Sequence, residues 1–183
     1  MVAPCFSSSD HSSVLDFLNT VIGGGGRSID ALNTDEDVAL WLQQAGYLRD
    51  GETPNSEAGE LSERARSLRE VLRELVTQRK AGALVEVTCL NALLAHGSYR
   101  TELQLDESGG IRMHRRYTAD TPYQFLMPVA VAAADLLARG NFRLIRKCEG
   151  DECPYWFYDR TKAHRRRWCN TALCGNRRKA ARF

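Results

Sequence analysis

The chain has 183 residues and a formal net charge of +2, and its length suits one compact domain with a small appendage. Residues 1–142 hold thirteen Lys and Arg against nineteen Asp and Glu, a net −6, whereas residues 143–183 hold twelve against four, a net +8. No apolar run approaches the ~18 residues of a membrane span, and the opening MVAPCFSSSDHSS lacks the basic and apolar regions of a signal peptide, so we expect a soluble, cytoplasmic protein.

Residues 1–142 are predicted to form a helical domain. Its first helix is expected from about Ser12 to Val21. The run Gly23–Gly26 that follows lacks the Gly-Lys-Ser/Thr of a phosphate loop, and it indicates a flexible turn. Thr34 is suited to cap a second helix, which would end at Gly46.

Two further helices are predicted from apolar residues at helical spacing. The first is long and amphipathic and covers about Glu57–Lys80, and the second covers Leu84–Ala95. Cys89 lies in the second of these stretches, and we expect it to pack in the core.

The hydrophobic period then changes from that of a helix to that of a strand. Tyr99–Leu105 and Ile111–Tyr117 flank a Gly-Gly turn and predict a β-hairpin. Arg112, His114 and Arg116 alternate with apolar residues and should form its solvent-exposed face.

The last helix of this domain is expected to start at Thr121 and to reach Arg139. Pro128 lies inside the helical pattern, where a proline removes a backbone donor and clashes with the preceding turn. We therefore expect a kink or a later start at this proline.

The most informative feature of the remaining segment is its four cysteines. They are spaced as C-x4-C, fifteen residues, and C-x4-C, which lets four thiolates meet at one tetrahedral metal ion. Two disulfides or four buried free thiols are the alternatives, but a cytosolic chain favours the metal. Because thiolates would fill all four positions, we expect a structural Zn²⁺ site with no open catalytic position. The expected ligands are Cys148, Cys153, Cys169 and Cys174.

The region from residue 143 to residue 183, which we call the finger, is predicted to have three parts. Phe142–Lys147 and Tyr155–Tyr158 should form a hairpin with the first cysteine pair at its tip. The second pair should sit where a final helix begins, an arrangement that resembles a treble-clef finger. Trp156 and Trp168 are expected to form the small core of the finger. The predicted fold is therefore mainly α (α+β), with a helical domain over 1–142, which carries a β-hairpin, and a treble-clef-like zinc finger over 143–183.

The positive charge of the finger comes chiefly from arginine, whose planar guanidinium suits bidentate contact with phosphate or guanine. A solvated basic face is the alternative, but the basic residues follow the acidic first knuckle as a surface of one sign. We expect contact with nucleic acid through Arg165, Arg166, Arg167, Asn176, Arg177, Arg178 and Lys179.

Around these residues the chain resembles a known bacterial family, the CGNR zinc finger. The matching residues are Cys174-Gly175-Asn176-Arg177, Phe157-Tyr158-Asp159, Arg166-Arg167-Trp168-Cys169 and Lys179. Lys162-Ala163-His164 stands where the family more often has Arg-Asn-x.

The preceding part resembles the domain that usually comes before this finger, ABATE, which is described as a stress-induced transcription regulator. The matching pieces are Leu15–Thr20 (LDFLNT), Trp41-Leu42 with Gly46, Leu68-Arg69-Glu70 and Ala132–Ala138.

The resemblance implies a bacterial DNA-binding transcription regulator. Double-stranded DNA is the expected partner, a small-molecule or protein effector would act at the N-terminal domain, and a homodimer is an expected assembly. The alternative is a protein-interaction module whose basic zinc finger docks on an acidic protein partner. RNA ranks lower because no aromatic RNA-recognition motif is visible.

An enzyme is the weakest interpretation. Asp16, Asn19 and His96 could form a site, but nothing in the sequence fixes their geometry, so no catalytic residue is expected. Asp16 and Asn19 lie three residues apart on one helix. They could form a polar patch that binds a small ligand, but we favour a hydrogen-bonded helix junction.

Overall fold

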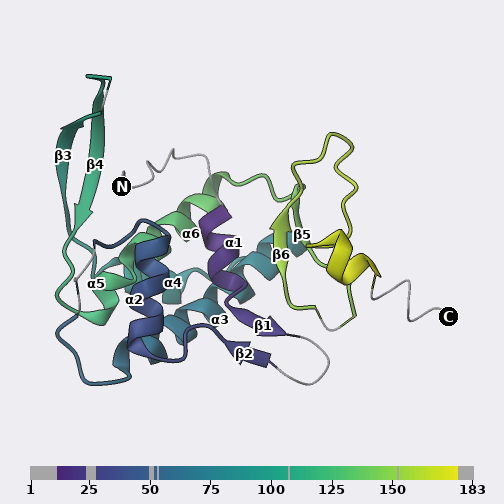
Figure 1. The fold of residues 1–183 in the computed structure, drawn as a ribbon, viewed down its shortest axis with the longest axis horizontal. Helices are drawn as coiled ribbons and strands as arrows, with labels where there is room; N and C mark the ends of the chain where they lie inside the picture. The colour runs from purple at the N-terminus through teal and green to yellow at the C-terminus, as the bar shows by residue number, and fades with distance from the viewer. Residues whose placement is uncertain are drawn as a thin grey trace.

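The computed structural model describes residues 12–23, 28–49, 52, 54–106, 108–151 and 153–176. Within these ranges, helices form the body of the molecule and three antiparallel pairs of strands complete it (Figure 1). The helices are α1 (Ser12–Leu18), α2 (Asp35–Gln44), α3 (Glu60–Ala81), α4 (Thr88–Leu94), α5 (Pro122–Phe125) and α6 (Met127–Arg139). The strand pairs are β1 (Val21–Gly23) with β2 (Ser28–Asp30), β3 (Tyr99–Leu105) with β4 (Ile111–Tyr117), and β5 (Ile145–Lys147) with β6 (Trp156–Tyr158). The mixed, mainly helical fold class is confirmed.

The long helix α3 lies at the centre of the hydrophobic core. Its buried residues recur at helical spacing along one face, and α1, α2, α4, α5 and α6 all contact it. The amphipathic helix predicted over Glu57–Lys80 is therefore confirmed, with its start at Glu60 after a left-handed Gly59. Buried residues of the neighbouring helices that share this core include Phe17, Leu42, Leu90, Phe125 and Ala133.

The start of α2 holds two helices together. The Thr34 hydroxyl accepts a hydrogen bond from the Asp37 N–H at 3.2 Å, and the Asp37 carboxylate accepts one from the Thr34 N–H at 2.9 Å. Asp35 reaches across to α3 and accepts from the N–H groups of Gly59 and Ser62, at 2.8 and 2.7 Å. These N–H groups have no partner inside their own helix, and the helix dipole favours a carboxylate there. The predicted cap at Thr34 is confirmed.

The first helix is shorter than the sequence predicts. It ends at Leu18, because Thr20 turns the chain by donating both its N–H and its hydroxyl to the Phe17 carbonyl oxygen. Val21 was expected to end the helix and instead opens β1. The predicted glycine turn falls mainly on residues 24–27, outside the described residues.

The fourth helix is also shorter, and it corrects one prediction. It begins at Thr88, where the sequence predicts a start at Leu84, and it buries Leu90 only. Cys89 is exposed, so the prediction that it packs in the core was wrong. A short apolar stretch does not reveal which side of the helix faces the core.

The helix predicted between Thr121 and Arg139 is divided in two. Helix α5 ends at Phe125 and α6 begins at Met127, with Pro128 in its first turn. A proline is tolerated there because the first N–H groups of a helix have no intrahelical acceptor. The predicted interruption is confirmed. Among the described residues, no helix has both the length and the apolar content to cross a membrane.

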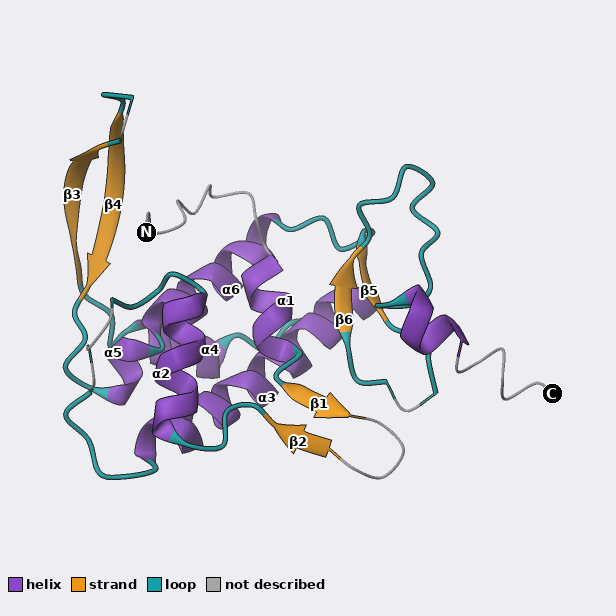
Figure 2. Cartoon of the chain, viewed as in Figure 1, coloured by secondary structure: helices purple, strands orange, loops and turns teal. Residues whose placement is uncertain are grey.

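The predicted β-hairpin is confirmed with its expected bounds. It stands away from the helical body, as Figure 2 shows. Arg112 and Arg116 form ion pairs with Asp106 and Glu102 on one of its faces, as expected for a face in water; the side chain of His114 lies outside the description. The apolar side chains that alternate with them are exposed as well.

The finger packs on the body through β6, which lies beside α1. Strands β5 and β6 pair with Lys147 opposite Trp156. After a long loop comes one wide helical turn, η1 (Thr171–Gly175), in which Cys174 lies. The described residues end at Asn176, so the course of the predicted final helix beyond that point lies outside them.

The two tryptophans of the finger have different surroundings. Trp168 packs with the cysteines, as predicted. Trp156 is 5% exposed and lies, with Ile145, in the core of the helical body. The prediction that it belongs to a separate finger core was wrong, because β6 turns this side chain toward the helices.

Candidate metal centre and basic loop

Pairing of β5 with β6 brings the first two cysteines together. Cys148 follows β5 and Cys153 lies shortly before β6, and the Cys148 N–H continues the ladder by donating to the Tyr155 carbonyl at 2.8 Å. Cys169 lies just before η1 and Cys174 lies within it. Two short structures, a hairpin and one helical turn, therefore each contribute a pair of thiols.

The four sulfur atoms form one compact group. Any two of them lie within 4.8 Å of each other. The Sγ atom of Cys169 is 3.7 Å from that of Cys153 and 3.7 Å from that of Cys174. Tetrahedral zinc with Zn–S bonds of ~2.3 Å separates its sulfurs by ~3.8 Å. The spacing therefore fits one zinc ion.

Backbone N–H groups support the sulfur of Cys148. It accepts hydrogen bonds from Cys169 at 3.3 Å and from Gly150 at 3.4 Å. Burial acts to raise the pKa of the Cys148 thiol, but these two donors, together with hydrogen bonds to the Cys153 and Cys169 thiols, bring the pKa below its usual value. A Cβ atom at Gly150 would lie 3.0 Å from the Cys174 Cβ, so a side chain here would crowd Cys174 and force it to shift.

Zinc held by these four thiolates is structural. The donor set completes a tetrahedron, which leaves no position for a reacting water molecule. Burial raises the pKa of the Cys153 thiol to about 11, so a cation is needed to hold the whole set as thiolates. When bound, the ion ties the β5–β6 hairpin to η1.

The loop after β6 is organised by one buried acid, Asp159, which has no exposed surface. Its Oδ1 atom accepts from the N–H and hydroxyl of Thr161, at 3.1 and 2.6 Å, and its Oδ2 atom accepts from the Arg166 N–H at 2.8 Å. Burial acts to raise the pKa of Asp159, but these hydrogen bonds and the nearby Arg146 bring it below its usual value.

The same loop is closed from a second side. Arg146 lies 3.5 Å from the Asp159 carboxylate and donates to the His164 carbonyl oxygen at 2.6 Å. His164 has φ of 48°, a left-handed conformation that a residue with a side chain adopts only when its surroundings enforce it. We call residues 160–167 the basic loop, and its backbone is fixed at both ends.

The predicted nucleic-acid residues fall into different environments. Arg165 is exposed, Arg167 is paired with Glu149 at 2.6 Å, and Asn176 is exposed after η1. The Arg166 guanidinium is held by the carbonyl oxygens of Trp168 and Cys169 and lies over the Phe157 ring. Its contacts are therefore structural. Arg177, Arg178 and Lys179 lie outside the described residues.

The junction between the body and the finger depends on Asn19. Its side chain donates to the Trp156 carbonyl at 2.7 Å and accepts from the Trp156 N–H at 2.8 Å. Asn19 thus belongs to a hydrogen-bonded junction, and its partner, which lies 137 residues away, could not be identified from the sequence. His96, considered with it in the sequence, stacks on Tyr123 at a ring separation of 4.7 Å.

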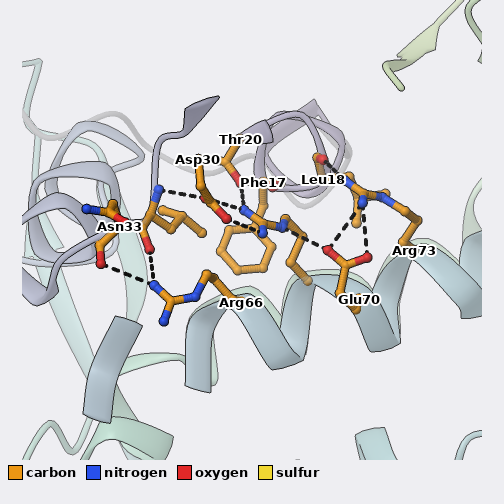
Figure 3. A network of polar contacts seen from close by, with 10 residues as sticks. Phe17, Leu18, Thr20, Asp30, Asn33, Arg66, Glu70 and Arg73 are labelled. Atoms are coloured by element: carbon orange, nitrogen blue, oxygen red, sulfur yellow. Dashed lines mark hydrogen bonds and ion pairs between the residues drawn. The ribbon is translucent and has the colours of Figure 1, made fainter. Parts of the chain in front are cut away.

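Thr20, the residue after Asn19, joins the end of α1 to α3 (Figure 3). Arg69 on α3 is 3% exposed. It donates to the Thr20 hydroxyl at 2.9 Å and to both carboxylate oxygens of Asp30, at 2.7 and 2.6 Å. This hydrogen bonding by Arg69, against the opposing effect of burial, lowers the pKa of Asp30. The network therefore holds Thr20, which follows α1, and Asp30, which ends β2, on the helix α3.

A cleft of about 560 Å³ lies between α1 and the finger. Asp16 and Asn19 line it on the side of α1, and Tyr155, Trp156, Arg160 and three of the cysteines line it on the side of the finger. Small-molecule sites have volumes of this order. The effector expected at the N-terminal domain stays a prediction, and this cleft is the place to look for it.

Two family models match the chain. Residues 12–140 match ABATE, described as "Putative stress-induced transcription regulator", and residues 144–183 match the CGNR zinc finger. Both matches agree with the resemblance seen in the sequence, in the same order along the chain. A search of curated proteins found no match.

Proposed function

Because the chain belongs to the ABATE family and carries a CGNR zinc finger, we propose that it is a cytoplasmic bacterial transcription regulator that binds double-stranded DNA with its basic finger. Zinc has a structural part in this proposal. It holds the hairpin and η1 together, and the protein's own side chains make the contacts with DNA.

The preorganised basic loop is the observation that carries the proposal. Asp159 fixes its backbone, while Lys162 and Arg165 are exposed. Neither has an acidic partner within the part of the chain that the structure describes. A loop that presents free cations without further ordering loses little conformational entropy on meeting a phosphate backbone.

Arg167 is a further candidate for phosphate contact, although it already has an acidic partner. Its pair with Glu149 is about half exposed on both sides, and exposed ion pairs of this kind contribute little to stability. A phosphate oxygen can therefore replace the carboxylate at small cost. Arg166, by contrast, is left out of the proposed contact set because its guanidinium already holds the backbone beside Cys169.

The test is duplex binding by the zinc-loaded full chain, measured by fluorescence anisotropy over a range of salt concentrations. For each phosphate contact, the logarithm of the binding constant should fall by ~0.9 per logarithm of salt concentration. We expect Arg165→Ala to reduce this slope by about 0.9. Arg49→Ala, at an exposed arginine after α2, is the matched control because it removes the same charge from the helical body.

A duplex affinity that does not change with salt would contradict DNA binding. The competing function, a basic finger that docks on an acidic protein, would then gain support if Arg165→Ala weakened capture of a protein partner in nuclease-treated extract. No effect of Arg165→Ala on either kind of partner would remove the basic loop from both proposals.

A further inference from the structure

The β3–β4 hairpin has two faces of different chemistry. Residues directly opposite each other in an antiparallel pair share a face, and every second residue returns to it. Tyr99 is opposite Tyr117, Leu103 opposite Met113, and Leu105 opposite Ile111. We call this the apolar face, and its eight residues are Tyr99, Thr101, Leu103, Leu105, Ile111, Met113, Arg115 and Tyr117.

The apolar face is open to solvent in the single chain. Leu103, Leu105, Ile111 and Met113 are 66–75% exposed, and Tyr99 is 53% exposed. These five are half of the ten large apolar residues that are exposed in the described part of the chain. Monomeric proteins rarely present so contiguous an apolar patch, and a hairpin of two strands is marginal in water without a packing partner.

The hairpin is nevertheless formed before any partner arrives. Asp106 fixes its turn by accepting from the N–H groups of Ser108 and Gly110, at 3.0 and 2.8 Å. Gly109 has φ of 80°, a conformation that costs glycine least. The hairpin also projects from the helical body (Figure 2), so its apolar face is accessible along its length.

We propose that the apolar face is the interface of a homodimer, in which the hairpins of two copies of this chain pack face to face. The charges of the hairpin argue for a copy of itself as the occupant. Glu102 is paired with Arg100 and Arg116, and Asp106 is paired with Arg112, all on the opposite face. The apolar face holds no acid.

One cation, Arg115, lies on the apolar face. Its guanidinium lies over the Tyr99 ring at 5.1 Å and is thereby kept against the surface of its own hairpin. Nothing on this face therefore selects a charged partner. A flat row of apolar side chains is complementary to an identical row related by a two-fold axis, and such isologous contacts are the commonest in homodimers.

The size of the face agrees with this occupant. Its five large exposed side chains offer on the order of 700 Å² per copy, close to the ~800 Å² per partner of a standard interface. The inference does not depend on DNA binding and is tested without DNA, so its failure and that of the proposed function are distinguishable.

The experiment is sedimentation equilibrium of the zinc-loaded full chain through the micromolar range. Leu103→Glu places a charge in the middle of the apolar face, and each substitution occurs twice in an isologous interface. Gln104→Glu is the matched control, since it adds the same charge at the next residue, on the opposite face. We expect the original chain and Gln104→Glu to dimerise alike, and Leu103→Glu to raise the dimer Kd by more than about 100-fold.

Leu103→Thr introduces a β-branched residue, which suits a strand, and tests the same point without a charge. We expect it to raise the dimer Kd about tenfold, and it replaces Leu103→Glu if that variant loses its far-UV circular dichroism. A chain that stays monomeric at every concentration tested would overturn the proposal, and a different protein would then be the candidate partner of the apolar face. A dimer whose Kd neither Leu103 variant changes would also overturn it.

Discussion

The side-chain amide of Asn19 pairs with the main chain of Trp156 as a neighbouring β-strand would. Its oxygen accepts from the Trp156 N–H at 2.8 Å, and its nitrogen donates to the Trp156 carbonyl at 2.7 Å. One residue directly after the first helix thereby satisfies the backbone groups on the open edge of β6 and links the finger to the helical body.

Asn19→Ala should weaken this junction. The substitution leaves two backbone groups of Trp156 without their partner, and we expect the free energy of unfolding to fall by about 2 kcal/mol. Urea denaturation of the zinc-loaded chain measures the change. Asn91→Ala, at an exposed position on α4, is the control; equal effects of the two substitutions would show that the pair contributes no stability.

The stability of the body should fall at acid pH partly through Asp30. Hydrogen bonding to Arg69 lowers the pKa of this carboxyl against the opposing effect of burial. A lowered pKa in the folded state means that the stabilisation is complete above the unfolded pKa of ~3.9 and is lost as pH falls through the folded value.

We therefore expect the difference in unfolding free energy between the original chain and Asp30→Asn to shrink below about pH 4. Urea denaturation at a series of pH values measures it. Loss of zinc at acid pH affects both chains alike, so it cancels in the comparison. A difference that stays constant from neutral to strongly acid pH would contradict this role of Asp30.

Removal of zinc should unfold the part of the finger that packs around the cysteines and leave the helices of the body largely formed. Cys174→Ser removes one of the four ligands, and we expect it to reduce the zinc content from one ion per chain to a small fraction, because a structural site needs all its ligands. Atomic absorption and far-UV circular dichroism measure the two effects. Cys89→Ser should keep the full zinc content, because Cys89 is exposed and lies outside the cluster.

Asp159→Ala separates loop geometry from charge in DNA binding. The change makes the finger more positive by one charge, which alone would strengthen binding to phosphates. We expect weaker binding, by about three- to tenfold, because the basic loop loses the carboxylate that orders it. Duplex anisotropy at fixed salt measures the affinity, and the zinc content shows whether the finger is still folded.

Asp151→Ala is the matched control for that variant, since it removes an exposed acid of the first cysteine knuckle. It should bind DNA slightly more tightly than the original chain. If Asp159→Ala also bound more tightly, the fixed geometry of the loop would have no part in recognition.

Features that depend on local pattern were predictable from the sequence. The period-two alternation predicted β3 and β4 with their observed bounds, and Thr34 with its acidic neighbours predicted the start of α2. The C-x4-C pairs predicted the metal centre for the same reason, because the spacing of ligands within each pair is a local property of the chain.

Features that depend on distant contacts were not predictable. Strand β1 has three residues beside a glycine run, too few for a hydrophobic period. The side of α4 that carries Cys89 is decided by what α4 packs against. Asn19 and Trp156 lie 137 residues apart. Neither residue has a local pattern that identifies the other as its partner, so a single sequence does not show the pairing.

The burial of Ile145 and Trp156 in the helical core means that the finger cannot be separated from the body without loss of packing. A fragment of residues 143–183 alone would expose to water two large side chains that are buried in the intact protein. If this fragment were fused to another protein, it would present an exposed apolar surface that favours non-specific association. The ABATE segment and the zinc finger therefore cannot be exchanged independently between proteins, because a change at their shared core in one must be matched in the other.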